Sequence, residues 1–176
     1  MKAKALLLTG APGVGKTTAV RKIAQELRAC RLRGFTTKEI REGGTRVGFR
    51  LETFEDESAV LAHLSFRSPH RVSKYGVDVD ALDGIVASAL RPSARTDLYL
   101  IDEIGKMECF SERFVIAVEE LLDSRRLLVA TVAQRGGDFI EEVKRRPAVE
   151  LWTVTRRRRD ETPDRVLEWL RSRGVG

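Results

Sequence analysis

The sequence is poor in the residues that build metal centres and disulfide frameworks. Its 176 residues include two cysteines and two histidines, and Cys30 and Cys109 have neither CxxC spacing nor a histidine close by. Structural zinc sites need four such ligands, and disulfide scaffolds need more cysteines than this. We therefore expect two reduced, partly buried thiols and no structural metal. A chain of this length buries enough apolar surface to fold without either.

Long apolar runs are also missing. The longest, Leu127–Ala133, is interrupted by Thr131, whereas a membrane helix needs about 18 consecutive apolar residues. Met1–Lys4 and the leucines after it resemble the start of a signal peptide, but Gly10–Gly13 ends that stretch early and no cleavage-type site follows. Repeats and linkers are not evident. The sequence therefore predicts a cytoplasmic protein with no membrane span and a single domain over residues 1–176.

Asparagine is absent, glutamine occurs only twice, and arginine outnumbers lysine 24 to 8. A low content of thermolabile amides is one trend among heat-adapted proteins, although GC-rich codon usage would also enrich arginine. We therefore hypothesise a thermophilic source. The net charge of +6 and the pI of about 9.7 favour an anionic partner, either nucleic acid or a polyphosphate. No obligate apolar interface is evident, so we expect a monomer.

Short apolar runs alternate with longer amphipathic segments along the chain. Strands are predicted at Ala5–Thr9, Leu98–Ile101, Leu127–Val132 and Val149–Val154, and helices at Gly15–Ala29, Asp80–Leu90, Ser111–Leu122, Asp138–Arg145 and from Thr162 onward. Ser111 and Thr162 are the expected helix N-caps. Phe35–Arg41 and Thr45–Thr53 flank a glycine pair and predict a β-hairpin, while Ser58–Leu64 fits either a strand or a helix. The pattern predicts an α/β fold with a mostly parallel central sheet, helices on both faces and the early antiparallel hairpin as an insertion.

A phosphate-binding loop of the form GxxxxGK[ST] lies between the first predicted strand and the first predicted helix, which is the context this motif requires. Its residues are Gly10, Ala11, Pro12, Gly13, Val14, Gly15, Lys16 and Thr17, followed by Thr18. The glycines let backbone N–H groups point inward, and with the helix N-terminus these groups form an anion site. Lys16 is placed for the β- and γ-phosphates, Thr17 for Mg²⁺, and Thr18 for the α-phosphate. The loop therefore predicts nucleotide binding with Mg²⁺ as the cofactor.

Two carboxylates follow the apolar strand Leu98–Ile101. Parallel strands deliver their C-terminal ends to the same sheet edge, so Asp102 is expected near the Mg²⁺, directly or through water. Glu103 is the candidate that polarises a water aimed at the γ-phosphate. Lys106 is either a cation that stabilises transition-state charge or a solvated surface lysine. Asp102–Gly105 also fits the DxxG element of GTPases, but their NKxD element cannot occur in a chain without asparagine.

Three parts of the chain resemble the thermophilic nucleoside-triphosphatase family, also called the cancer-related nucleoside-triphosphatase family. They are Gly10–Thr18, the pair Gly34–Glu39 and Arg46–Phe49 in the hairpin, and Asp102–Glu108, which is the most specific part. The likeness extends over nearly the whole chain. It implies a RecA-like P-loop hydrolase that slowly converts ATP, GTP, CTP and UTP to diphosphate and phosphate, with Mg²⁺ and a loose base preference.

The resemblance also implies roles for individual residues. The loop holds the phosphates with Lys16, Asp102 serves the metal, Glu103 activates water, and Lys106 becomes a catalytic candidate. The family's late Asn-Arg-Asp motif is Arg158-Arg159-Asp160 in this chain. Arg159 is therefore retained as a nucleotide-binding candidate. The base preference stays open, because an arginine can stack on a base but offers no amide pair.

The run Arg156–Arg159 has three interpretations: a lid over the nucleotide, a nucleic-acid contact through phosphates, or a solvated loop. It follows a predicted strand at the ligand edge, which favours a lid over a detached basic arm. Nucleic-acid binding is the least favoured, since the aromatic residues that single-stranded nucleic-acid binders interleave are missing. Arg135, after the third buried strand, either touches phosphate or ends a strand, and Tyr75 is expected to pack in a turn.

Two functions other than hydrolysis stay open from the sequence. A nucleoside or nucleotide kinase would share the loop and the metal-binding acid, and it would need an acceptor pocket. The segment Ser58–Val79 is the candidate for that pocket, although it carries no acceptor-binding motif. A nucleotide-switched module that binds RNA or a protein would instead use Arg156–Arg159.

Overall fold

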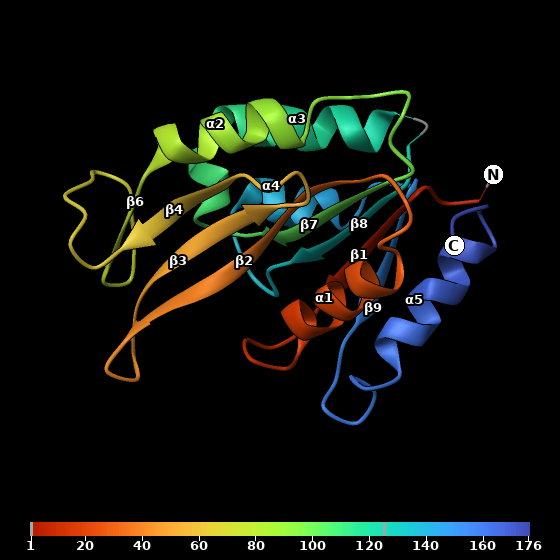
Figure 1. Cartoon of the computed structure of the whole chain (residues 1–176), viewed down its shortest axis with the longest axis horizontal. Coiled ribbons are helices and arrows are strands. Elements are labelled where there is room, and N and C mark those ends of the chain that lie inside the picture. Colours follow the sequence, from red (N-terminus) through yellow and green to blue (C-terminus); the bar gives the residue numbers. More distant parts are fainter. Residues whose placement is uncertain (1, 125) are drawn as a thin grey trace.

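The computed structural model describes residues 2–124 and 126–176, and in it helices cover both faces of one large sheet (Figure 1). The strands are β1 (Ala5–Thr9), β2 (Leu32–Glu42), β3 (Thr45–Thr53), β4 (Ser58–His63), β5 (Arg71–Val72), β6 (Tyr75–Val77), β7 (Leu98–Ile104), β8 (Leu128–Val132) and β9 (Val149–Thr153). The helices are α1 (Lys16–Glu26), α2 (Val79–Ala89), α3 (Glu112–Asp123), α4 (Asp138–Val143) and α5 (Thr162–Arg171), with the 3-10 helix η1 (Glu108–Phe110). None of the helices formed by the described residues is long and apolar enough to cross a bilayer.

The sheet order is β5-β6-β4-β3-β2-β7-β8-β1-β9, so β8 lies between the loop-bearing strand β1 and the acid-bearing strand β7. Strands β2, β7, β8, β1 and β9 pair in parallel, and the predicted α/β class is confirmed. The antiparallel part is larger than the predicted hairpin. Ser58–Leu64 resolves as strand β4, and β5 and β6 extend the same sheet.

The hairpin continues the central sheet instead of forming a separate insertion. The first part of β2, Leu32–Phe35, pairs in parallel with β7, and the rest of the strand, from Phe35 onward, pairs antiparallel with β3. Because a strand has two hydrogen-bonding edges, this one strand joins the parallel and antiparallel halves. The antiparallel half therefore begins at β2, next to the acid-bearing strand β7.

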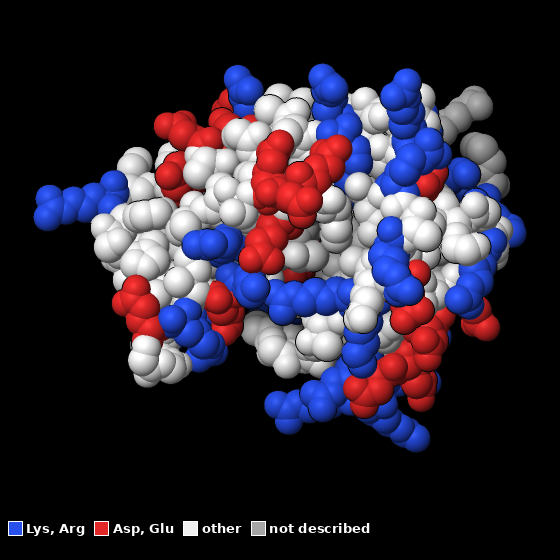
Figure 2. All heavy atoms as spheres, in the orientation of Figure 1, with Lys and Arg blue, Asp and Glu red and all other residues white. Residues whose placement is uncertain are grey.

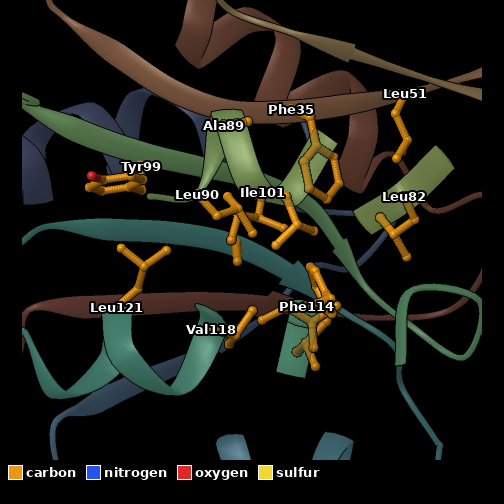
Figure 3. Close-up of a cluster of buried hydrophobic side chains, with 14 of the residues drawn as sticks. Phe35, Leu51, Leu82, Ala89, Leu90, Tyr99, Ile101, Phe114, Val118 and Leu121 are labelled. Carbon is orange, nitrogen blue, oxygen red and sulfur yellow. The ribbon is translucent and has the colours of Figure 1, made fainter. Parts of the chain in front are cut away.

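Successive side chains of each strand enter two different cores, as the two-residue period of a strand requires. From β1, Ala5 and Leu7 pack under α2, α3 and α4, whereas Leu6 and Leu8 pack under α1 and α5. Figure 3 shows the first of these cores, in which Phe35 and Phe114 lie between the sheet and the helices. Both faces of the parallel half are buried, which explains its nearly continuous apolar strands.

Several helix and strand ends differ by one to three residues from the sequence expectation. Ser111 caps α3 as predicted, since its Oγ accepts a hydrogen bond from Phe114 N at 2.9 Å. Thr162 is instead the first residue of α5, and its hydroxyl donates to the carbonyl of Arg158. Helix α1 ends at Glu26 rather than at residue 29, and β7 continues to Ile104 because its last residues still pair with β8.

Helix α2 begins one residue earlier than predicted, at Val79. Asp78 is its N-cap, and the Asp78 carboxylate accepts a hydrogen bond from Ala81 N at 2.9 Å. Tyr75 is buried and packs edge-on against Phe49 with ring centroids 5.2 Å apart, which confirms a packing role, but it lies in strand β6 and not in a turn.

Candidate active site

The phosphate-binding loop connects β1 to α1, and its glycines adopt conformations that other residues rarely reach. Gly10, Gly13 and Gly15 have φ values of 151°, 75° and 117°, in the left-handed region that favours glycine. A Cβ at Gly10 would also lie 2.5 Å from the carbonyl oxygen of Val154. The tight turn at this strand end therefore depends on glycine both for its backbone conformation and for space.

Lys16, the first residue of α1, is buried and points back over the loop. Its Nζ donates to the carbonyl oxygens of Gly10 at 2.8 Å and Ala11 at 3.3 Å. The ammonium group is thus held beside the concave side of the loop, where the N-terminus of α1 adds its positive dipole end. The positive charge of Lys16 therefore lies at the loop, and phosphate binding there stays a prediction.

Asp102 lies near the end of β7 and is 2% exposed. Its Oδ1 accepts a hydrogen bond from the hydroxyl of Thr131 on β8 at 2.7 Å, and its backbone carbonyl accepts one from the hydroxyl of Thr37. Its Oδ2 is buried and has no hydrogen-bond partner among the described residues. A buried carboxylate oxygen without a partner is costly, so this atom is suited to a cation.

Glu103 is half-buried, and burial raises the pKa of its carboxyl above the usual value. The Lys16 ammonium lowers that pKa and the Asp102 charge raises it, with burial the largest cause. A carboxylate with a raised pKa is a stronger base than an exposed glutamate. The predicted division between a buried acid for the metal and a neighbouring base is therefore consistent with the two environments.

Glu108, in η1, is a site residue that the sequence reasoning did not single out. Its side chain is 4% exposed, and burial, reinforced by the charges of Glu103 and Asp102, raises its pKa to about 8. A Cβ at Gly105 would lie 2.8 Å from Glu103 Oε1 and 2.9 Å from Glu108 Oε2. The two carboxyl groups thus converge over one glycine, which leaves room for both.

The loop and the acidic strand end border one cavity of about 920 Å³. The predicted residues that line it are Gly10, Pro12, Gly13, Gly15, Lys16, Thr17, Thr18, Asp102, Glu103 and Lys106. Arg135, Arg21, Thr37 and Glu108 line it as well. Its volume lies in the range of small-molecule sites. The structure therefore brings the phosphate-binding, metal-binding and basic candidates to a single cavity.

Three predicted binding residues lie elsewhere. Ala11 is exposed at the outer side of the loop and contributes its carbonyl to Lys16. Val14 is buried in the core under α1 and α5. Its side chain therefore anchors the loop and does not face the cavity. Arg159 does not line the cavity, but a Cβ at Gly15 would lie 3.5 Å from its Cδ. Arg159 is thus beside the loop, on its α5 side.

Arg156–Arg159 form an exposed turn between β9 and α5, in which Arg158 N donates to the carbonyl of Thr155 at 3.0 Å. Figure 2 shows basic side chains extending from the lower margin of the molecule, where Figure 1 places this loop. Elsewhere on that face Lys and Arg alternate with Asp and Glu. The run therefore borders the phosphate-binding loop at Arg159, and the lid interpretation stays a prediction.

The two cysteines are free and half-buried, which confirms the expected thiols. Burial raises the pKa of Cys109 to about 12, so this thiol is protonated and unreactive at neutral pH. Among the residues that the structure describes, no group of three or more His, Cys, Asp or Glu side chains is placed to hold a metal ion.

This fold and cavity define a P-loop nucleotide-binding protein. The family model described as NTPase matches residues 5–167, and the chain belongs to this family. It is 38% identical over 167 residues to the nucleoside-triphosphatase THEP1 of Thermotoga maritima, a match that covers 94% of this chain and 95% of the relative. The corresponding protein of Methanosarcina acetivorans is 37% identical over 174 residues, which cover 96% of this chain and 98% of the relative.

Solved structures show the same fold. The crystal structure of THEP1 from the hyperthermophile Aquifex aeolicus has a TM-score of 0.86 and 34% sequence identity, over 94% of this chain and 98% of that one. The solution structure of a human cancer-related nucleoside triphosphatase has a TM-score of 0.83 and 31% sequence identity, over 97% of this chain and 98% of that one. The resemblance inferred from the Gly10–Thr18 and Asp102–Glu108 segments is therefore confirmed.

Proposed function

We propose that the protein hydrolyses nucleoside triphosphates to diphosphate and phosphate, with Mg²⁺ as its cofactor. The single observation that carries the proposal is the convergence of Lys16, Asp102 and Glu103 on one cavity beside the phosphate-binding loop. The relatives named as nucleoside-triphosphatases support the reaction type. Membership of the NTPase family supports it further.

The residues present fit Mg²⁺. Mg²⁺ is usually held by one or two protein ligands and by the phosphates of its nucleotide, so a cluster of protein carboxylates is not required. The buried Oδ2 of Asp102 is free to accept a cation, and the Thr17 hydroxyl lines the same cavity. When bound, the ion would neutralise charge on the β- and γ-phosphates.

The chain's own residues then have separate tasks. The loop amides and Lys16 bind and orient the phosphates, which places the γ-phosphorus toward the acidic strand end. Glu103 accepts a hydrogen bond from the attacking water and takes up its proton as the new bond to phosphorus forms. Lys106 faces the cavity from an exposed position and adds positive charge for the transition state.

We also propose loose base preference and slow turnover. The groups that converge in the cavity are directed at phosphates, and Arg159 can stack on a base without selecting one. Slow turnover is what the resemblance to the nucleoside-triphosphatase family implies.

A steady-state assay with ATP, GTP, CTP and UTP in turn, with and without Mg²⁺, tests this proposal. We expect phosphate release from all four nucleotides at rates within about tenfold of one another, and loss of release when Mg²⁺ is chelated. Release from one nucleotide alone would overturn the loose base preference. Undiminished release without divalent cations would overturn the role of Asp102.

A further inference from the structure

Asp102 and Glu103 lie in a gap of the hydrogen-bonding ladder that holds the sheet together. On one side, β7 pairs with β2 only as far as Ile101, which lies opposite Phe35. On the other side, the register between β7 and β8 shifts between Ile101 and Ile104. In the described part of the chain, neither acid has a paired residue on a neighbouring strand. Strand pairing therefore does not by itself fix the two carboxylates that the proposed reaction needs.

Two threonine hydroxyls bond to Asp102 in this gap, one from each neighbouring strand. Thr131 on β8 donates to Asp102 Oδ1 at 2.7 Å and fixes the carboxylate. Thr37 on β2 donates to the Asp102 carbonyl, which belongs to the peptide group that joins Asp102 to Glu103. The branched side chain of threonine has restricted rotamers, which suits a rigid support. The bond from Thr37 therefore holds the backbone of both acids, and it leaves Asp102 Oδ2 available for a cation.

Thr37 is itself held from the side of the phosphate-binding loop. Arg21 on α1 donates from its Nη2 to the Thr37 carbonyl at 2.7 Å. Just before Thr37 along β2, a Cβ at Gly34 would clash with the carbonyl oxygen of Leu100, so β2 runs close to β7. Thr37 and Arg21 both line the nucleotide cavity. A chain of hydrogen bonds therefore runs along the cavity wall from α1 through Thr37 to the acidic strand end.

We propose that Thr37 is a positioning residue whose hydroxyl holds Asp102 and Glu103 toward the phosphate-binding loop. The inference rests on the proposed function, in which these acids serve the cation and the attacking water. Thr37 acts through them and takes no part in the bonds that form and break. A misplacement of about 1 Å in an active site can lower a rate about a hundredfold. Loss of this hydroxyl should therefore slow phosphate release more than it weakens nucleotide binding by the loop and Lys16.

Steady-state phosphate release by Thr37→Val and Thr37→Ser is the first test. Valine has nearly the shape of threonine but no donor, and it is well tolerated in strands. We expect Thr37→Val to lower kcat at least tenfold and to keep KM for MgATP within about threefold. Thr37→Ser keeps the hydroxyl and should restore kcat to within about threefold of the unmodified chain. Denaturant unfolding at pH 7 checks that both variants keep the fold.

A second readout does not require hydrolysis. Mn²⁺, which prefers the same oxygen ligands as Mg²⁺, is titrated into the full chain with saturating ADP and followed by electron paramagnetic resonance. We expect Thr37→Val to weaken Mn²⁺ binding at least threefold, because Asp102 is then less well fixed. Thr37→Ser should bind Mn²⁺ within about twofold of the unmodified chain.

Thr36→Val is the matched control, because it changes the same residue type one position earlier on β2. Successive side chains of a strand point to opposite faces, and Thr36 is buried without lining the nucleotide cavity. Both kcat and Mn²⁺ affinity should stay within about twofold of those of the unmodified chain. Losses equal to those of Thr37→Val would show a general effect of altering β2 and would overturn the proposal.

The outcomes separate this inference from the proposed function. Unchanged kcat and Mn²⁺ affinity in Thr37→Val would overturn the inference and leave hydrolysis standing, and so would a Thr37→Ser variant as impaired as Thr37→Val. Absence of phosphate release by the unmodified chain would contradict the proposed function. The Mn²⁺ titration then decides alone: weaker binding by Thr37→Val supports the hold on Asp102, and unchanged binding overturns it.

Discussion

At the scale of single residues, the most unusual feature is the pair of glutamates that meets over Gly105. Glu103 is the penultimate residue of β7 and lines the nucleotide cavity, and Glu108 is buried in the short helix that follows. Burial raises the cost of ionising Glu108, and the charge of Glu103 raises it further. These effects raise the pKa of Glu108 to about 8, so its carboxyl holds a proton at neutral pH.

The buried carboxyl of Glu108 makes stability depend on pH. Its pKa is about 8 in the folded protein against a usual value of 4.5. Between these values the folded chain keeps a proton that the unfolded chain has lost, so the free energy of unfolding falls as pH rises, by at most about 1.4 kcal/mol per pH unit. Glu108→Gln cannot ionise. The free energy of unfolding of this variant should therefore rise relative to that of the unmodified chain as pH rises from about 5 to 8.

Denaturant unfolding of both proteins at several pH values measures this difference. Glu112→Gln, which changes an exposed glutamate at the start of α3, is the matched control and should show no such trend. A stability difference between Glu108→Gln and the unmodified chain that stays constant over this range would contradict the assignment.

The candidate site residues were predictable where they belong to a contiguous motif or follow directly after a buried strand. Lys16 and Thr17 belong to a contiguous motif, and Asp102 and Glu103 follow an apolar strand whose end must reach the same edge. Glu108 was not predictable, because its burial arises from packing between η1 and the sheet. Thr131 had one signal, a polar residue that interrupts an apolar strand, but its bond to Asp102 depends on the order of the strands.

At the scale of elements, the segment from β7 through η1 to α3 carries much of the proposed chemistry. It holds both glutamates and Lys106, and its end is fixed by Ser111 at the start of α3. The Ser111 hydroxyl accepts from Phe114 N and also donates to the carboxylate of Asp83 on α2. One side chain therefore joins α2 and α3 at the edge of the site.

Ser111→Ala should lower the free energy of unfolding by about 1–2 kcal/mol. The change removes the helix cap and leaves Asp83 without this hydrogen bond. Reversible denaturant unfolding at pH 7 measures the effect. A destabilisation below about 0.5 kcal/mol would show that the cap contributes little to this fold.

Elements whose hydrophobic pattern has one clear period were predictable, and elements that depend on pairing between strands were not. The buried strand β1 and the helix α3 lie close to their expected positions. Ser58–Leu64 was ambiguous because a short apolar run fits either a strand or a helix, and pairing with β3 decides for the strand. That β2 joins the two halves of the sheet could not be predicted, since a local pattern does not specify a strand's neighbours.

At the scale of the whole molecule, charge is organised as local networks more than as one basic surface. Figure 2 shows positive and negative side chains interspersed over the visible face. Arg146 pairs with Asp123 at 2.8 Å and lies 3.9 Å from both Glu119 and Glu142, which connects α3 and α4. Networks of this kind and the absence of asparagine are features of heat-adapted proteins.

The thermal unfolding midpoint tests the hypothesis of a thermophilic source. Domains of mesophilic proteins unfold at about 45–65 °C. We expect a midpoint above this range by calorimetry at low salt. A midpoint inside it would contradict the hypothesis and would leave codon usage as the explanation of the arginine content.

The measurement that tests the central claim most directly is a single-turnover assay of γ-phosphate release from MgATP, with nucleotide binding measured on the same samples. The account predicts that Glu103→Gln binds ATP within about threefold of the unmodified chain and releases phosphate at least tenfold more slowly. Lys16→Ala should lose both binding and release. Phosphate release at the unmodified rate by Glu103→Gln would contradict the account, because the base that activates water would then lie elsewhere.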